Sequence, residues 1–153
     1  MLIDLPKRAL DLATYAHEGQ KRRDKVTPYI THPMRVGVRF SDPLLQAVGY
    51  LHDVLEDTPA DRRIFSFFGI PDPVYYAVLA MTKIPGENYA NYLVRVKFNH
   101  AARTIKIADI DDNLSDTPTA KQRTKYSLAL AFLRTGDAWN ASALESLKTA
   151  FHA

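Results

Sequence analysis

Residues 51–58 read LHDVLEDT, a stretch that places a histidine and three acids inside an otherwise apolar, helix-like pattern. Residues three and four apart share one face of a helix, so Asp53, Glu56 and Asp57 should point broadly the same way, with His52 beside them. No lysine or arginine lies nearby to neutralise the acids. Because buried acids without partners are costly, a bound cation would be the simplest remedy. On its own, however, the motif is more typical of an exposed acidic helix end.

Helical periodicity extends from this stretch in both directions. Apolar residues recur at helix spacing, and prolines, glycines and capping residues mark the ends. Residues 103–107 come nearest to a strand, and no repeat or low-complexity linker divides the chain. We therefore expect an all-α fold, a compact bundle of roughly eight to ten helices, forming one domain over residues 1–153. The predicted helices cover residues 4–18, 33–40, 43–57, 60–68, 73–82, 87–99, 101–113, 120–134 and 140–152.

The composition narrows the class of protein. The chain has 153 residues, of which 46% are hydrophobic, and this is enough for a sizeable core. It contains no apolar run near the roughly 20 residues of a membrane span, and its first residues do not resemble a signal peptide. The absence of cysteine excludes disulfides and thiolate metal sites, and it fits a cytoplasmic location.

The charge pattern is more specific than the net charge. A formal net charge of +3 is too small to indicate a nucleic-acid-binding protein. The segment QKRRDK at residues 20–25, however, places four cations within six residues. Such a run is usually a solvated loop, but it would also suit a small acidic substrate.

Two further segments contain residues that could bind a metal. PYITHP, at residues 28–33, places His32 between a turn and a helix start, and IKIADIDDN, at residues 105–113, embeds Asp109 in an apolar stretch. With His52 and Asp53 they offer two nitrogen and two carboxylate ligands from three predicted helices. That set suits an octahedral divalent ion such as Mn²⁺ with water in the remaining positions, and suits a closed structural zinc site less well.

The sequence motifs around these residues resemble those of a known family. AHEGQKRRDKVTPYITHPMRV (residues 16–36), LHDVLEDT and IKIADIDDN together resemble the hydrolase domain of RelA/SpoT homologues, within the HD superfamily of metal-dependent phosphohydrolases. The small, single-domain alarmone hydrolases are the most similar type, and the resemblance extends from about Ala9 to Tyr126. It implies a guanosine-3′,5′-bis(diphosphate) 3′-pyrophosphohydrolase that converts (p)ppGpp to GDP or GTP and pyrophosphate.

The resemblance also implies roles for individual residues. One Mn²⁺ per chain would be bound by His32, His52, Asp53 and Asp109. Glu56 would orient or deprotonate the attacking water, and Asp57 would assist it or pass a proton toward the leaving side. Substrate contacts would come from Arg22, Arg23, Lys25, Lys83, Asn113 and Tyr126.

Some features leave the substrate open. Asp111 and Asp112 stand where larger relatives often carry Leu and His, and they could alter how a polyphosphate sits. Lys106 could reach phosphate or cover the outside of a helix, and Tyr29 is expected to pack rather than bind. The alternatives are an HD phosphohydrolase acting on an adenine alarmone or on the 2′-phosphate of NADPH, and a catalytically silent alarmone-binding module. We expect a nucleotide as partner, with no nucleic acid and no membrane, and homo-oligomer formation stays open.

Overall fold

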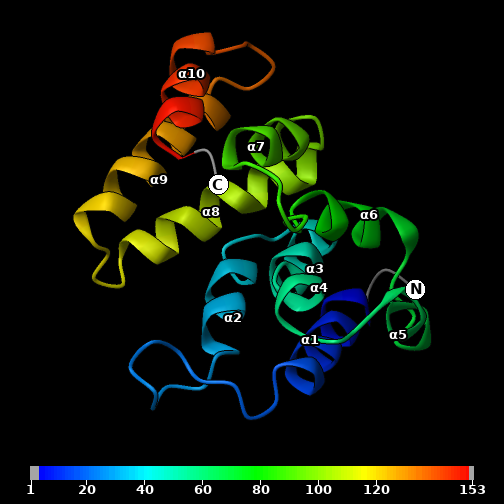
Figure 1. The fold of residues 1–153 in the computed structure, drawn as a ribbon. Coiled ribbons are helices and arrows are strands. Elements are labelled where there is room, and N and C mark those ends of the chain that lie inside the picture. Colours follow the sequence, from blue (N-terminus) through cyan, green and yellow to red (C-terminus); the bar gives the residue numbers. More distant parts are fainter. Residues whose placement is uncertain (1–3, 152–153) are drawn as a thin grey trace.

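The computed structural model describes residues 4–151, and within them it contains ten helices and no strand (Figure 1). The all-α bundle expected from the sequence is confirmed. None of the described helices is both long and apolar enough to cross a membrane. The helices are α1 Leu5–Ala16, α2 Thr31–Gly37, α3 Pro43–Leu51, α4 Val54–Asp57, α5 Arg62–Phe67, α6 Asp72–Ala80, α7 Tyr89–Lys97, α8 His100–Leu114, α9 Ala120–Leu133 and α10 Ala141–Ala150.

The helix predicted over residues 43–57 is wrong in one respect, because the structure divides it in two. Helix α3 ends at Leu51, His52 and Asp53 form a turn, and α4 begins at Val54. The imidazole Nδ1 of His52 donates to the carbonyl of Gly49 at 2.7 Å, and Asp53 adopts φ −100° and ψ −3°. A side chain that competes for a helix carbonyl favours a local break. The break turns the side chains of His52 and Asp53 toward one point.

Side-chain caps fix where the helices around this break begin. Asp42 accepts hydrogen bonds from two backbone N–H groups of α3, and Pro43 occupies the first turn. Asn99 accepts one such bond, from the N–H of Ala102 in α8, and Thr119 forms a capping box with Gln122 at the start of α9. Each such cap stabilises a helix by about 1 kcal/mol and sets its register.

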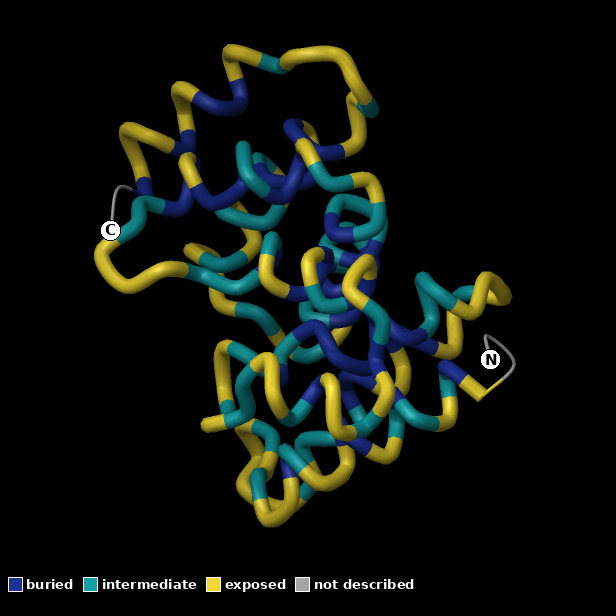
Figure 2. Tube along the Cα trace, turned by 90° about the vertical axis from the view of Figure 1, so that its right-hand side faces the viewer, coloured by how far each residue is buried: buried dark blue, intermediate teal, exposed yellow. Residues whose placement is uncertain are grey.

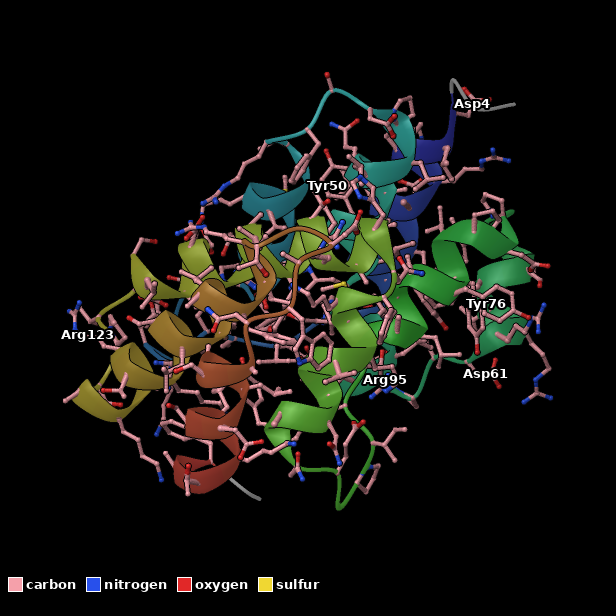
Figure 3. The ribbon with its side chains drawn as sticks, turned by 90° about the horizontal axis from the view of Figure 1, so that it is seen from above. Asp4, Tyr50, Asp61, Tyr76, Arg95 and Arg123 are labelled. Carbon is pink, nitrogen blue, oxygen red and sulfur yellow. The ribbon has the colours of Figure 1, made fainter. Side chains whose placement is uncertain are left out.

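The core joins the two ends of the described chain. Buried apolar side chains from Leu5 to Phe151 form one hydrophobic cluster. Figure 2 shows the buried parts of the trace inside the molecule and the exposed parts along its outer turns. Charged side chains such as Asp61 and Arg123 point outward in the view from above (Figure 3).

Helices α2, α3 and α8 pack against one another and position the candidate site. Each of the three contacts the other two, and α3 also packs against α1 and α6. A Cβ added to Gly49 would lie 2.7 Å from Cα of Gly37, so α2 and α3 cross with their backbones in close contact. This crossing brings His32, on α2, next to His52, at the end of α3.

Candidate metal centre and nucleotide cavity

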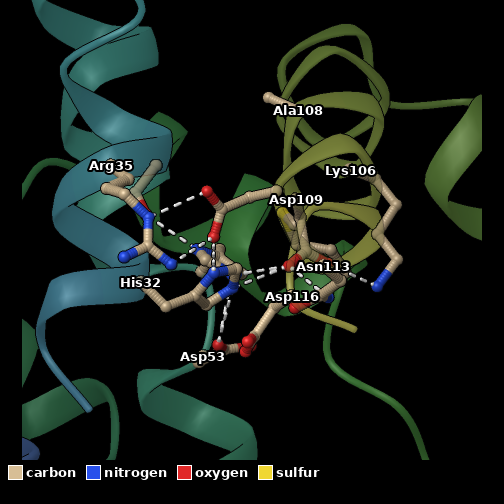
Figure 4. A network of polar contacts seen from close by, with 12 residues as sticks. His32, Arg35, Asp53, Lys106, Ala108, Asp109, Asn113 and Asp116 are labelled. Carbon is tan, nitrogen blue, oxygen red and sulfur yellow. Dashed lines mark hydrogen bonds and ion pairs between the residues drawn. The ribbon is translucent and has the colours of Figure 1, made fainter. Parts of the chain in front are cut away.

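Two histidines and two aspartates, carried by α2, the turn between α3 and α4, and α8, lie close together. Figure 4 shows His32, Asp53 and Asp109 of this group. The Nε2 atoms of His32 and His52 lie 3.2 Å apart. Asp109 Oδ1 lies 2.8 Å from Nε2 of His32 and 3.3 Å from Nε2 of His52. Asp53 Oδ2 lies 3.1 Å from Nε2 of His52 and 3.7 Å from Nε2 of His32. All four residues named from the sequence as metal ligands therefore converge.

The outer nitrogen of each ring determines what the inner nitrogen can do. Nδ1 of His32 lies 2.6 Å from a carboxylate oxygen of Asp112, and Nδ1 of His52 lies 2.7 Å from the carbonyl oxygen of Gly49. Both partners are acceptors, so each Nδ1 carries the hydrogen, and in a neutral ring Nε2 keeps its lone pair. The ligand atoms of His32, His52 and Asp109 lie within 4.8 Å of one another. This donor set fits a divalent ion, because neutral imidazoles fixed by an outer hydrogen bond are typical metal ligands.

The carboxylates of the cluster concentrate negative charge around this point. Burial opposes ionisation of Asp53, but His52 beside it lowers the pKa of Asp53 to about 2. Burial likewise opposes ionisation of Asp109, yet Lys106 and His52 hold its pKa well below the usual range. Burial disfavours a charge on His52, and the two carboxylates nevertheless raise its pKa well above the ordinary value. A proton and a divalent cation thus compete for the same lone pair of His52.

A cavity of about 400 Å³ opens onto this cluster. Most of the residues named from the sequence as substrate contacts or catalytic acids line it. Lys25 and Lys83 do not line it, and His52 is buried outside its lining. The lining residues are Lys21, Arg22, Arg23, Tyr29, His32, Asp53, Glu56, Asp57, Lys106, Asp109, Asn113 and Tyr126.

The two acids named as catalytic differ in their surroundings. Glu56 Oε1 accepts a hydrogen bond of 2.7 Å from the backbone N–H of Lys83, so Lys83 contacts the site through its main chain. Asp57 is exposed toward the cavity, but partial removal of its carboxyl from water, followed by the charges of Asp53 and Glu56, raises the pKa of Asp57 to about 6. Glu56 is therefore held in place, whereas Asp57 carries a proton more readily than an ordinary aspartate.

Tyr29 has a larger role in the site than the sequence interpretation gave it. Its hydroxyl donates to Asp53 Oδ2 at 2.5 Å and lies 3.3 Å from Asp57 Oδ2. Its ring packs against His17, with 4.9 Å between the ring centroids. The expected packing is thus accompanied by a bridge between a candidate ligand and a candidate catalytic acid. Its place three residues before His32 was the available signal.

Lys106 faces the cavity and not the outside of α8. Its Nζ donates to Asp109 Oδ2 at 2.8 Å and lies 5.4 Å from the centroid of the Tyr92 ring. The spacing of three residues between Lys106 and Asp109 places both on one helix face. The sequence did not decide between these two positions of the Lys106 side chain, and the packing of α8 places it toward the cavity.

The cationic segment of residues 20–25 divides in the structure. Arg22 forms a 2.7 Å ion pair with Asp116, just after α8, and Arg23 donates to Gln122 of α9 at 3.3 Å. Lys21 also lines the cavity, whereas Lys25 is exposed at φ 63° in the turn between residues 21 and 28. Three of the four cations can therefore meet an anionic ligand in the cavity.

The acids that follow Asp109 do not line the cavity. Asp111 pairs with Arg134, the residue that caps the C-terminus of α9, at 3.2 Å. Asp112 is 2% exposed and lies against His32 and Arg35. Burial opposes its ionisation, but the hydrogen bonds from Arg35 and His32 keep the pKa of Asp112 below the ordinary value. The structure therefore gives Asp111 and Asp112 no direct contact with a polyphosphate bound in the cavity.

The fold and the site define an all-α protein with a buried His/Asp cluster at the base of a cation-lined cavity. No protein-family model matches the chain. The chain is 35% identical over 105 residues to a GTP pyrophosphokinase of Streptomyces coelicolor; the match covers 63% of the chain but only 11% of that longer protein. The fold matches a solved structure of a metazoan orthologue of SpoT, described as hydrolysing ppGpp, with a TM-score of 0.71 and 24% identity, over 94% of this chain and 93% of the other. The resemblance to RelA/SpoT homologues is thus confirmed.

Proposed function

We propose that this protein is a metal-dependent (p)ppGpp 3′-pyrophosphohydrolase that releases pyrophosphate and leaves GDP or GTP. The observation that carries the proposal is the meeting of His32, His52, Asp53 and Asp109 beside a cavity lined by arginines. The fold shared with a SpoT orthologue described as hydrolysing ppGpp supports the same activity. Mn²⁺ is the proposed ion, because two imidazoles and two carboxylates with room for water suit it.

The proposed centre supplies charge and holds the reacting groups. A divalent ion bound there would neutralise phosphoryl charge and make a neighbouring water more acidic. Phosphoryl transfer otherwise depends on positioning and electrostatic stabilisation. The buried rings of His32 and His52, fixed through their Nδ1 atoms, keep the ligand geometry constant. The chain thus needs little rearrangement to bind its metal.

Glu56 and Asp57 divide the proton handling in this proposal. Glu56, held by the backbone of Lys83, orients and deprotonates the attacking water. Asp57, whose pKa is raised to about 6, can carry a proton toward the leaving side at near-neutral pH. These surroundings support Glu56 as the group that acts on the water and Asp57 as the group that carries a proton, an assignment that the sequence left open.

The substrate's anionic groups are held by the cations of the cavity. Arg22 and Arg23 suit phosphate, because a guanidinium can make two parallel hydrogen bonds to it. Asn113 of α8 and Tyr126 of α9 line the same cavity and are proposed to contact the ribose and base. Lys25 and the side chain of Lys83 are left out of this proposal, because they do not line the cavity.

Phosphorus NMR of the purified protein with Mn²⁺ and ppGpp tests the proposal. We expect pyrophosphate and GDP, with turnover abolished by a chelator and restored by excess Mn²⁺. A parallel reaction with NADPH serves as the control for substrate. Release of orthophosphate from NADPH, with no product from ppGpp, would contradict ppGpp as the substrate and would still indicate a metal-dependent hydrolase. Binding of ppGpp to metal-loaded protein without any product would indicate a silent binding module instead.

A further inference from the structure

Asp112 is a buried carboxylate that neither the cavity nor the proposed ligand set uses. It lies on α8, three residues after Asp109, and is 2% exposed. Its Oδ2 lies 2.6 Å from Nδ1 of His32, the ring nitrogen that faces away from the cluster. The same imidazole therefore contacts two carboxylates of α8, Asp109 through Nε2 and Asp112 through Nδ1.

Arg35 of α2, and Arg39 just after that helix, hold Asp112 in place from its other side. Arg35 donates through Nε to Oδ1 at 3.0 Å and through Nη2 to Oδ2 at 3.1 Å, and Nη2 of Arg39 lies 3.5 Å from Oδ1. Such a forked pair restricts the carboxylate to one orientation and keeps it ionised, so it can only accept from the imidazole.

We infer that Asp112 is a positioning residue that fixes the tautomer and orientation of His32 for metal binding. This inference rests on the proposed metal site. An ionised carboxylate at Nδ1 retains the hydrogen there, so the lone pair of His32 lies on Nε2, 3.2 Å from Nε2 of His52. It also makes the imidazole a stronger donor to the metal, and loss of such an outer partner typically weakens metal binding 10- to 100-fold.

The neighbouring acid supplies a matched control. Asp111 is adjacent on the same helix and carries the same charge, but it pairs with Arg134 on the outside of α8. An Asp111→Asn variant removes one negative charge close to the cluster without touching His32. A difference between the variants at positions 111 and 112 therefore reports the contact with the ring and not the net charge.

The test measures Mn²⁺ affinity of the full chain by the EPR signal of free Mn²⁺ at constant pH. We expect Asp112→Asn to weaken binding about 10- to 100-fold and Asp111→Asn to change it less than about twofold. An Arg35→Met variant, which keeps the bond between Asp112 and His32, should weaken binding less than Asp112→Asn does. Equal affinity in Asp112→Asn and the wild type would overturn the inference. An equal loss in Arg35→Met and Asp112→Asn would do the same, because it would indicate a general packing effect.

Nitrogen NMR of the imidazoles in metal-free protein provides a second readout. In the wild type and in Asp111→Asn, we expect His32 to be protonated at Nδ1, and in Asp112→Asn we expect this fixed tautomer to be lost. An unchanged His32 spectrum in Asp112→Asn would contradict the inference, whatever the protein hydrolyses. A wild type that binds Mn²⁺ through these residues but releases nothing from ppGpp would instead overturn the proposed function alone.

Discussion

His52 and Glu56 lie four residues apart in the sequence, yet their surroundings suit them to different tasks. His52 is buried, with Nδ1 on a backbone carbonyl and Nε2 within 3.3 Å of both Asp109 and Asp53. Glu56 is exposed to the cavity and bonded to one backbone N–H of the segment that follows α6. Substitution of His52 should therefore weaken metal binding, and substitution of Glu56 should slow the chemical step.

We predict that Glu56→Ala keeps the metal and loses turnover. The expected fall in kcat is about 10²- to 10⁴-fold, the range for loss of a general base. His52→Ala should instead lose metal affinity together with activity, because it removes a ligand from the cluster. Steady-state kinetics combined with Mn²⁺ titration of both variants checks this. Metal loss in Glu56→Ala would show that Glu56 is a ligand and not the base.

Asp57 makes the stability of the metal-free protein depend on pH. Its pKa is raised to about 6 in the folded chain, mainly by partial removal of the carboxyl from water, so folding favours the protonated form. The contribution of Asp57 is therefore fully present below its unfolded pKa of roughly 4 and is lost as pH rises through about 6. We predict that Asp57→Asn raises Tm relative to the wild type at pH 7 and loses this advantage at pH 4. Thermal unfolding in chelator across that window checks the sign, and a larger advantage at the lower pH would contradict it.

At the scale of elements, the site depends on where α3 stops and on how closely α2 crosses it. The helix patterns and caps could be predicted from the sequence because they depend on neighbours along the chain, as with Asp42 and Pro43 before α3. The break at His52 could not be predicted, because the apolar periodicity continues through it. The contact between His32 and Asp112 was also hidden, since it joins residues 80 positions apart and depends on how α8 packs against α2.

We predict that Gly49→Ala is destabilising even though alanine is the better helix former. The gain in helix propensity is at most about 1 kcal/mol. The added Cβ would lie 2.7 Å from Cα of Gly37 and 3.0 Å from its nitrogen, backbone atoms that cannot rotate away. We expect a net loss of about 1–3 kcal/mol in the free energy of unfolding and weaker metal binding, because α2 and its His32 must move outward. Urea unfolding measures the first effect, and a variant as stable as the wild type would show that the crossing is looser.

At the scale of the molecule, the cavity joins parts of the chain that are far apart in sequence. The segment before α2 is tied to the region after α8 by the Arg22–Asp116 ion pair and to α9 through Gln122. The sequence motifs indicated the four candidate ligands, but the lining of the cavity by Lys21, Tyr29 and Lys106 depends on this assembly. A ligand set drawn from α2, the α3–α4 turn and α8 exists only when these parts are packed together.

Metal binding should therefore stabilise the whole fold and not only one segment. An ion that binds only the folded state adds about 2.7 kcal/mol when its free concentration is one hundred times Kd. We predict that Mn²⁺ raises Tm of the wild type by several degrees, that a chelator reverses the shift, and that His52→Ala shows almost none of it. Calorimetry over a series of Mn²⁺ concentrations checks this, since the shift must grow with the logarithm of free metal. An equal shift in wild type and His52→Ala would place the stabilising ion elsewhere on the protein, because the variant lacks a nitrogen on which the proposed centre depends.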